Sequence, residues 1–238
     1  MDWNDYDTAL FDLDGVITPT ADVHMSAWEQ LFSGFLASRG VQEPYVSEDY
    51  FHFIDGKPRY EGVRSFLASR HLELPEGDPS DPSSAETVCG LGNRKNDAFS
   101  AVLSEHGVTA YPGSVALLDH LAKVGVKIAV VSSSRNAPAV LVAAGLRDRF
   151  EVVVDGNVAA DHGLVGKPSP QTFEFAARQL DTPVGRAVVL EDALSGVAAG
   201  HAGGFGLVVG VNRGVGADRL QESGADVVVD DLDELVPR

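Results

Sequence analysis

The chain has 238 residues, of which 44% are hydrophobic, and a net charge of −17. That length suits one domain with a large insertion, or two domains. The negative charge argues against nucleic acid and anionic membranes as partners, because both require basic surfaces. No apolar run approaches the ~20 residues of a membrane span, the amino terminus is acidic rather than signal-like, and a single cysteine requires no oxidising compartment. We therefore expect a cytoplasmic, monomeric protein.

The first predicted element is a short apolar strand over residues 8–11, which ends in Asp12, Asp14 and Gly15. Alternate residues of a strand point to the same side, so the two carboxylates leave the sheet together. They repel each other unless a proton or a cation lies between them. One carboxylate of such a pair can act as a nucleophile while the other carries a proton.

A helical segment follows. Apolar residues in residues 21–35 recur at helical spacing, and amphipathic helices are predicted at 60–70 and 86–105. Residues 74–84, between the last two helices, are rich in Pro, Asp, Ser and Gly and are expected to form an exposed, irregular segment. We interpret residues 21–105 as a helical cap domain inserted into a core domain made of residues 1–20 and 106–238.

Strands and helices alternate through the rest of the chain. Strands are predicted at 127–131, 152–154, 187–190, 206–211 and 227–229, and helices at 114–124, 137–144, 170–180 and 194–202. This alternation predicts an α/β fold with a Rossmann-like parallel sheet. Ligands of such sheets bind at the carboxyl ends of the strands.

Polar residues follow three of these strands, and a lysine lies in a connecting loop. The rule on carboxyl ends predicts that they meet at one edge of the sheet: Asp12, Asp14, Ser132, Ser134, Asn136, Lys167, Glu191 and Asp192. Each of these motifs, taken alone, also has an explanation that involves no functional site. A serine run after a strand and a Lys-Pro pair are common, and Asp192 could be the N-cap of the next helix.

In order along the chain, these pieces resemble the four motifs of the haloacid dehalogenase-like (HAD) superfamily. The first is Phe11-Asp12-Leu13-Asp14-Gly15-Val16 with Thr18. The resemblance implies a phosphotransferase in which Asp12 forms an aspartyl phosphate, Asp14 transfers the proton and Lys167 supplies positive charge. It also implies Mg²⁺ held by Asp12, Glu191, Asp192 and the backbone carbonyl of Asp14, with Ser132 binding the phosphoryl oxygens.

The insertion resembles the β-phosphoglucomutase branch of that superfamily in three strings: Thr20, His24 and Trp28; Gly56-Lys57-Pro58-Arg59; and Arg94-Lys95-Asn96-Asp97. The resemblance implies that a small phosphorylated sugar binds to Thr20, His24, Trp28, Gly56, Arg59, Lys95, Ser134 and Asn136, with Arg59 on a second phosphate. Two alternatives stay open: His24 as an ordinary residue at a helix end, and Arg94 with Lys95 as a solvated helix face.

The resemblance leaves the phosphoryl acceptor open. Pro19 and Asp55 stand where the known mutase has an acidic residue and a lysine, and Asp-Gly-Lys-Pro-Arg resembles the β-phosphoglucomutase family hydrolases. We favour a mutase that converts β-glucose 1-phosphate to glucose 6-phosphate through the 1,6-bisphosphate. A sugar-phosphate phosphatase is the alternative. A receiver-like signalling domain is disfavoured, because receivers are shorter and carry the phosphorylated aspartate on a middle strand.

Overall fold

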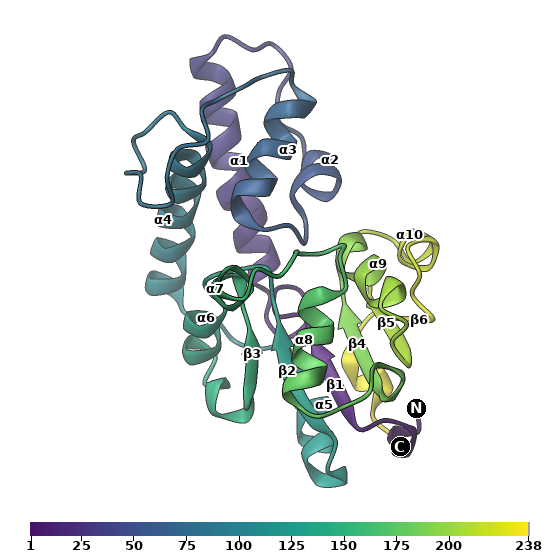
Figure 1. Ribbon diagram of the computed structural model, residues 1–238. Coiled ribbons are helices and arrows are strands. Elements are labelled where there is room, and N and C mark those ends of the chain that lie inside the picture. Colours follow the sequence, from purple (N-terminus) through teal and green to yellow (C-terminus); the bar gives the residue numbers. More distant parts are fainter. Residues whose placement is uncertain (238) are drawn as a thin grey trace. The chain divides into compact units, whose positions relative to one another are not determined.

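The computed structural model describes residues 1–237 of the chain. The chain divides into two compact units, Met1–Pro19 with Val108–Arg238, called the core below, and Thr20–Gly107, called the cap (Figure 1). The cap is therefore an insertion, which the chain enters and leaves once. Among the helices of the described residues, none has the length and apolar character needed to cross a membrane.

A six-stranded parallel sheet organises the core, and it confirms the predicted α/β class. The strand order is β3-β2-β1-β4-β5-β6, so the first strand lies in the middle. The strands are β1 (Thr8–Phe11), β2 (Lys127–Val131), β3 (Val152–Val154), β4 (Ala187–Glu191), β5 (Leu207–Val211) and β6 (Val227–Val229).

The central strands are apolar at successive positions because both faces of the sheet are covered. Every residue of β1 and β4 is buried, as expected for a parallel sheet between helical layers. Phe11 pairs with Val130 of β2 and with Leu190 of β4. This register sets the carboxyl ends of β1, β2 and β4 level with one another at one edge of the sheet.

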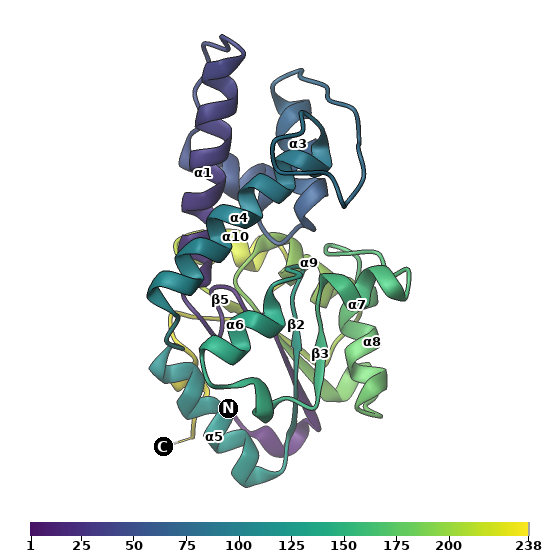
Figure 2. The ribbon, with the colours of Figure 1, turned by 90° about the vertical axis from the view of Figure 1, so that its left-hand side faces the viewer.

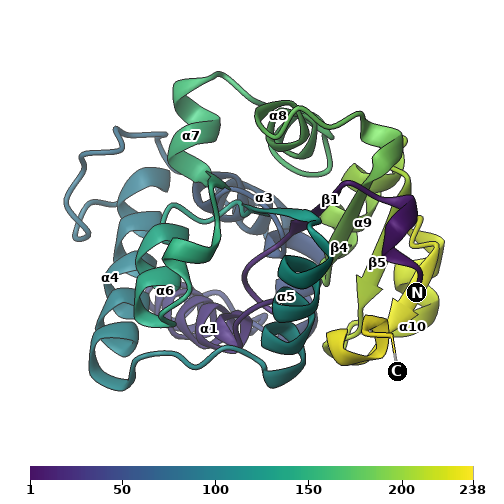
Figure 3. The same cartoon turned by 90° about the horizontal axis from the view of Figure 1, so that it is seen from below.

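Helices cover the two faces of this sheet. Helix α8 packs on β1, β2 and β3, α9 packs on β4 and β5, and α5 packs on β2; α5 and α8 lie on opposite faces (Figures 1 and 3). The core helices are α5 (Pro112–Val124), α6 (Ala137–Ala143), α7 (Gly156–Asp161), α8 (Gln171–Gln179), α9 (Leu194–Ala202) and α10 (Ala217–Glu222).

The two ends of the described chain meet at the amino end of β1. The indole nitrogen of Trp3, in the 3₁₀ turn η1 (Trp3–Asp5), donates to the carbonyl of Leu235 at 3.0 Å. Leu235 ends another 3₁₀ turn, η5 (Leu232–Leu235). The labels N and C accordingly lie close together in the turned view (Figure 2).

The cap is helical and has its own apolar core. Its elements are α1 (Thr20–Ser38), α2 (Ser47–Asp49), a π-helical turn (Tyr50–Ile54), α3 (Arg59–Ser69) and α4 (Val88–His106). Phe32 of α1 stacks on Trp28 and on Phe66 of α3, with ring centroids 5.3 and 3.8 Å apart. Residues 74–84 are irregular, as predicted, but hydrogen bonds tie them to α4: Asn93 donates to the carbonyls of Pro79 and Asp81.

Several short elements were not predicted. Helices α2, α7 and α10 have 3, 6 and 6 residues, too few turns for a periodic apolar stripe to show in a sequence. The sequence offers Asp192 as the N-cap of α9, but the residue at the N-cap position of this helix is Ala193.

Candidate active site

The aspartate pair follows β1 in a tight turn. Asp12 is buried, and its backbone N–H still donates to Leu190 on the neighbouring strand, at 2.9 Å. Gly15 has a φ of +88°, and a Cβ at this position would lie 1.8 Å from the Oδ2 atom of Asp192. Glycine is thus required there both for the turn and for the close approach of a carboxylate from the end of β4.

Lys167 joins the ends of three strands. Its ammonium donates to Asp12 Oδ1, to the carbonyl of Val131 at 3.0 Å and to Glu191 Oε2 at 2.7 Å. Only 1% of its surface is exposed. The lysine therefore balances charge within the cluster instead of facing bulk water, and it reaches the aspartate of the first motif as expected.

Glu191 is the last residue of β4 and is buried beside this lysine. Its Oε1 accepts from the backbone N–H of Ala193 at 3.1 Å. Across from it, a Cβ on Gly196 of α9 would lie 2.0 Å from Oε2. Gly196 thus leaves room for a carboxylate of the site, which no local pattern in the sequence signals.

Three carboxylates of this cluster fit a hard divalent cation. Asp12, Glu191 and Asp192 each offer an oxygen, and these oxygens lie within 4.8 Å of one another. Oxygen ligands of this kind suit Mg²⁺. The carboxylate of Asp14 is not in that group and instead accepts from the hydroxyl of Ser132 at 3.5 Å.

The charges of the cluster also favour a cation. Burial and the neighbouring charge of Asp12 raise the pKa of Glu191 to about 8. Burial alone would lower the pKa of Lys167, but the charges of Asp12 and Glu191 raise it. Near neutral pH Glu191 therefore keeps a proton, because one ammonium does not balance all the carboxylates of the cluster. A bound divalent cation would take the place of that proton.

The loop after β2 supplies hydroxyl and amide groups to the same edge. Besides contacting Asp14, the buried Ser132 accepts from the backbone N–H of Ser134 at 3.0 Å. The hydroxyl of Ser134 in turn accepts from the N–H of Asn136 at 3.1 Å. The predicted core residues are therefore brought together, with N–H and O–H groups beside the carboxylates.

Inside the cap, the structure brings together His24, Trp28 and Lys95. Lys95 is 3% exposed, contacts Nδ1 of His24 and lies 5.2 Å from the ring centroid of Trp28. His24 also stacks on Phe99, with ring centroids 4.1 Å apart. A solvated position is therefore wrong for Lys95. Thr20, the first residue of α1, is buried as well.

The other predicted cap residues lie around α3 and α4. Arg59 donates to Asn96 Oδ1 at 2.6 Å, and Gly56 has a φ of +70° in the turn before α3. Arg94 differs from Lys95: it is half-exposed, donates to the carbonyl of Ser83 at 2.8 Å and pairs with Glu86 at 3.3 Å. Arg94 thus ties the irregular segment of the cap to α4.

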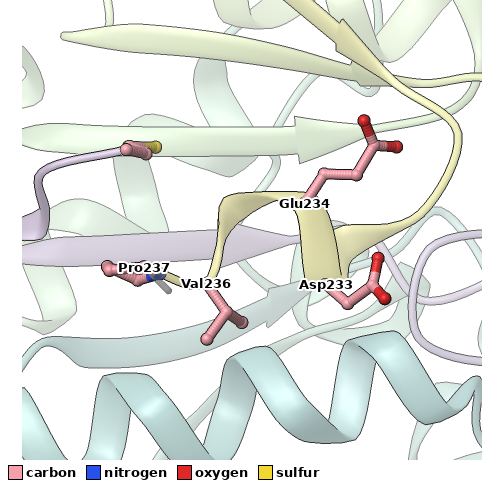
Figure 4. A pocket seen from close by; sticks show the side chains of 5 residues that line it. Asp233, Glu234, Val236 and Pro237 are labelled. Carbon is pink, nitrogen blue, oxygen red and sulfur yellow. The ribbon is translucent and has the colours of Figure 1, made fainter.

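A pocket of about 480 Å³ lies elsewhere in the core, lined by Met1, Asp233, Glu234, Val236 and Pro237 (Figure 4). None of its lining residues is among the predicted site residues. Glu234 Oε1 accepts from the N–H groups of Asp230 and Asp231 at 2.9 and 3.1 Å. That carboxylate serves the local turn, so we assign no chemistry to this pocket.

Relatives of known function share most of this chain. It is 48% identical over 237 residues to the β-phosphoglucomutase of Mycobacterium tuberculosis, an alignment that covers 95% of this chain and 90% of the relative. It is 30% identical over 230 residues to hexitol phosphatase A of Escherichia coli, covering 95% and 91%.

Structural and family comparisons agree with this. The fold matches a crystal structure of β-phosphoglucomutase from Clostridium difficile with a TM-score of 0.78 and 26% identity, covering 97% of this chain and 93% of that one. The sequence model described as "Hydrolase: haloacid dehalogenase-like hydrolase" matches residues 6–204. The chain is therefore an enzyme, a phosphomutase or a phosphatase, and belongs to the haloacid dehalogenase-like family.

Proposed function

We propose that this enzyme is a Mg²⁺-dependent β-phosphoglucomutase, which converts β-glucose 1-phosphate to glucose 6-phosphate through the 1,6-bisphosphate. The observation that carries the chemistry is the buried contact of Lys167 with both Asp12 and Glu191. It joins a nucleophile, a cation and a metal ligand at the edge of the sheet where α/β enzymes bind their ligands. The identity of 48% to a mycobacterial β-phosphoglucomutase supports the choice of substrate.

In this proposal, Asp12 attacks phosphorus in line with the sugar oxygen. The bond from phosphorus to that oxygen breaks, and Asp14 donates a proton to the leaving oxygen. In the second half of the reaction, Asp14 takes the proton of the acceptor hydroxyl, whose oxygen attacks the aspartyl phosphate and releases Asp12. Lys167 holds one oxygen of Asp12 throughout, which orients the carboxylate for attack.

The chain's own groups also bind the phosphoryl oxygens. Ser132 and the N–H groups of the loop that follows it would donate hydrogen bonds to these oxygens, which gain charge in the transition state. Mg²⁺ bound by Asp12, Glu191, Asp192 and the carbonyl of Asp14 would neutralise charge that otherwise keeps a carboxylate and a phosphate apart.

A sugar-phosphate phosphatase is the second candidate. Water would then accept the phosphoryl group, with Asp14 as its general base. The similarity to hexitol phosphatase A, at 30% identity, favours it, as do the departures at Pro19 and Asp55. Arg59 at the start of α3 favours the mutase, because this cap guanidinium would bind the second phosphate of a sugar bisphosphate. Membership of the family leaves no role for the receiver-like alternative.

One incubation separates the two candidates. The enzyme is mixed with β-glucose 1-phosphate, Mg²⁺ and a trace of the 1,6-bisphosphate, and the products are resolved by phosphorus NMR. Glucose 6-phosphate as the main product supports the mutase. Inorganic phosphate and free glucose as the main products would contradict the mutase and support the phosphatase. If neither product forms, the choice of glucose as the sugar is wrong.

A further inference from the structure

Arg213 joins four parts of the core around the turn that holds the aspartate pair. It follows β5, and its Nε donates to the carbonyl of Gly15 at 2.9 Å. Its Nη1 donates to the carbonyl of Asp230 after β6, at 2.8 Å. Its guanidinium lies 4.0 Å from the ring centroid of Tyr111. Nothing in the sequence places this arginine near Asp12 or Asp14, which it follows by about two hundred residues.

Gly15 is a sensitive point of that turn, which we call the β1 loop (residues 12–18). It directly follows Asp14, and it lies against the carboxylate of Asp192, because a Cβ added to Gly15 would come within 1.8 Å of Oδ2. The loop closes on itself through the hydrogen bond from Gly15 N–H to Thr18, 2.7 Å long. A shift of the Gly15 carbonyl would therefore move both Asp14 and the space that Asp192 occupies.

Tyr111 connects Arg213 to the segment on which the chain returns from the cap. The N–H of Tyr111 donates to the carbonyl of Ile17 in the β1 loop at 2.9 Å, and the hydroxyl of Ser114 donates to Val16 at 2.6 Å. The guanidinium thus holds the outgoing segment by a hydrogen bond and the returning segment by contact with an aromatic face. Both segments belong to the core.

The chemistry of arginine suits this role and a lysine would not reproduce it. A guanidinium is planar and rigid, so it can donate to two carbonyls in fixed directions while its face stacks on a ring. Its remaining nitrogen, Nη2, is buried with no hydrogen-bond partner among the described residues, which is unfavourable. Stability alone therefore does not explain an arginine at this position.

We propose that Arg213 is a positioning residue that fixes the β1 loop, and through it Asp14 and the metal-binding carboxylates. This rests on the proposed function only in so far as Asp14 transfers the proton. Removing Arg213 deletes no group that would touch substrate, but it lets the Gly15 carbonyl move. The expected effect falls on kcat and on Mg²⁺ affinity, and only slightly on KM.

The test compares Arg213→Ala and Arg213→Lys with Arg186→Ala. Arg186 is the matched control because it also braces β1, at the opposite end: it makes two hydrogen bonds of 2.7 Å to Asp7. Four readouts are taken on the full chain: kcat and KM on an aryl phosphate, the Mg²⁺ dissociation constant by calorimetry, the melting temperature, and amide hydrogen exchange of residues 12–18 without metal.

For Arg213→Ala we expect kcat to fall about 10- to 100-fold, Mg²⁺ binding to weaken by about tenfold and exchange in the β1 loop to accelerate. Arg213→Lys should give values of kcat, Mg²⁺ affinity and loop exchange between those of the wild type and Arg213→Ala. It replaces the alanine variant in the test if that variant does not fold. Arg186→Ala should keep wild-type kcat, Mg²⁺ affinity and loop exchange, whatever its melting temperature.

Two results would overturn the proposal. One is wild-type kcat, Mg²⁺ affinity and loop exchange in both Arg213 variants. The other is a set of losses in Arg186→Ala equal to those in Arg213→Ala at the same change of melting temperature. If the wild-type enzyme turned over no phosphoester at all, the proposed function would fail. The Mg²⁺ and exchange measurements would still decide the role of Arg213.

Discussion

Two glycines and a lysine show how much of this site depends on single residues. Gly15 and Gly196 each stand where a side chain would overlap a carboxylate, and Lys167 bridges Asp12 and Glu191. A buried charge is tolerated only where a partner faces it. The site is therefore compact because Lys167 pairs with the buried carboxylates and the two glycines leave room for the carboxylates of Asp192 and Glu191.

Replacing Asp12 with asparagine tests the nucleophile. Asp12→Asn keeps the size of the side chain but removes the charged oxygen that would attack phosphorus, so we expect activity to fall below detection for both sugar phosphates and aryl phosphates. Circular dichroism and the melting temperature check that the protein stays folded. Substantial remaining turnover in a folded variant would remove Asp12 from that role.

Gly196→Ala should damage metal binding through a single methyl group. The new Cβ would lie 2.0 Å from Glu191 Oε2, so the carboxylate must move. We expect Mg²⁺ affinity and kcat each to fall at least tenfold, on the scale of lost supporting contacts at metal sites. Gly200→Ala on the same helix is the control, since the atoms nearest to its Cβ would belong to valine side chains, at 3.1 Å and beyond. Equal Mg²⁺ affinity in the two variants would contradict this account.

At the scale of elements, all six strands were predicted because parallel strands buried on both faces appear as continuous apolar runs. Their level carboxyl ends followed from the rule for such sheets, and with them the meeting of Asp12, Lys167 and Glu191. Contacts set by tertiary packing could not be predicted. Arg213 reaches Gly15 from the far end of the chain, and Gly196 meets Glu191 across a helix–strand contact. No local pattern encodes either.

Helix α1 offers a direct test of local propensity. Gly34 lies inside this helix, and a Cβ there would meet no atom within 4 Å. Alanine should therefore add helix propensity without a clash, and Gly34→Ala should stabilise the cap by about 0.5–1 kcal/mol. Urea unfolding monitored by tryptophan fluorescence measures this, because Trp28 belongs to the same helix. A destabilised variant would mean that this face of α1 is covered in solution.

The start of helix α3 carries the test for a second phosphate. Arg59 is held by Asn96 at 2.6 Å, so its guanidinium is already oriented before substrate binds. We expect Arg59→Ala to lower mutase turnover at least tenfold, the loss of one oriented charge-assisted contact, and to leave hydrolysis of an aryl phosphate nearly unchanged. Arg94→Ala, which loses a contact to Glu86, is the matched control. Equal loss of both activities in Arg59→Ala would exclude a role specific to the second phosphate.

At the scale of the whole molecule, the acidic composition and the acidic site work together. With a net charge of −17, the folded chain is already destabilised by repulsion between its negative charges, so buried carboxylates add no stability. Yet three carboxylates, two of them buried, share one small volume with the buried Lys167. Such a cluster destabilises the metal-free fold and would become favourable if a divalent cation bound to it. Stability should therefore depend jointly on pH and on Mg²⁺.

The sign of that dependence follows from Glu191. Its pKa is raised from the ordinary 4.5 to about 8 in the folded, metal-free protein. Between these values the folded chain holds a proton that the unfolded chain has released, so metal-free stability falls as pH rises from about 4.5 to about 8. Above about 8 no further loss comes from this group. Because Mg²⁺ must displace the same proton, its affinity rises with pH over that window.

We therefore expect saturating Mg²⁺ to raise the melting temperature more at pH 8 than at pH 6, by several degrees. The measurement is the difference in melting temperature between samples with Mg²⁺ and samples with EDTA at each pH. Groups that titrate equally in both samples do not contribute to this difference. Glu191→Gln should bind Mg²⁺ more weakly and lose most of the pH dependence of that difference. A Mg²⁺ effect of equal size at pH 6 and pH 8 in the wild-type enzyme would mean that Glu191 is already ionised when the metal arrives, with Lys167 balancing its charge.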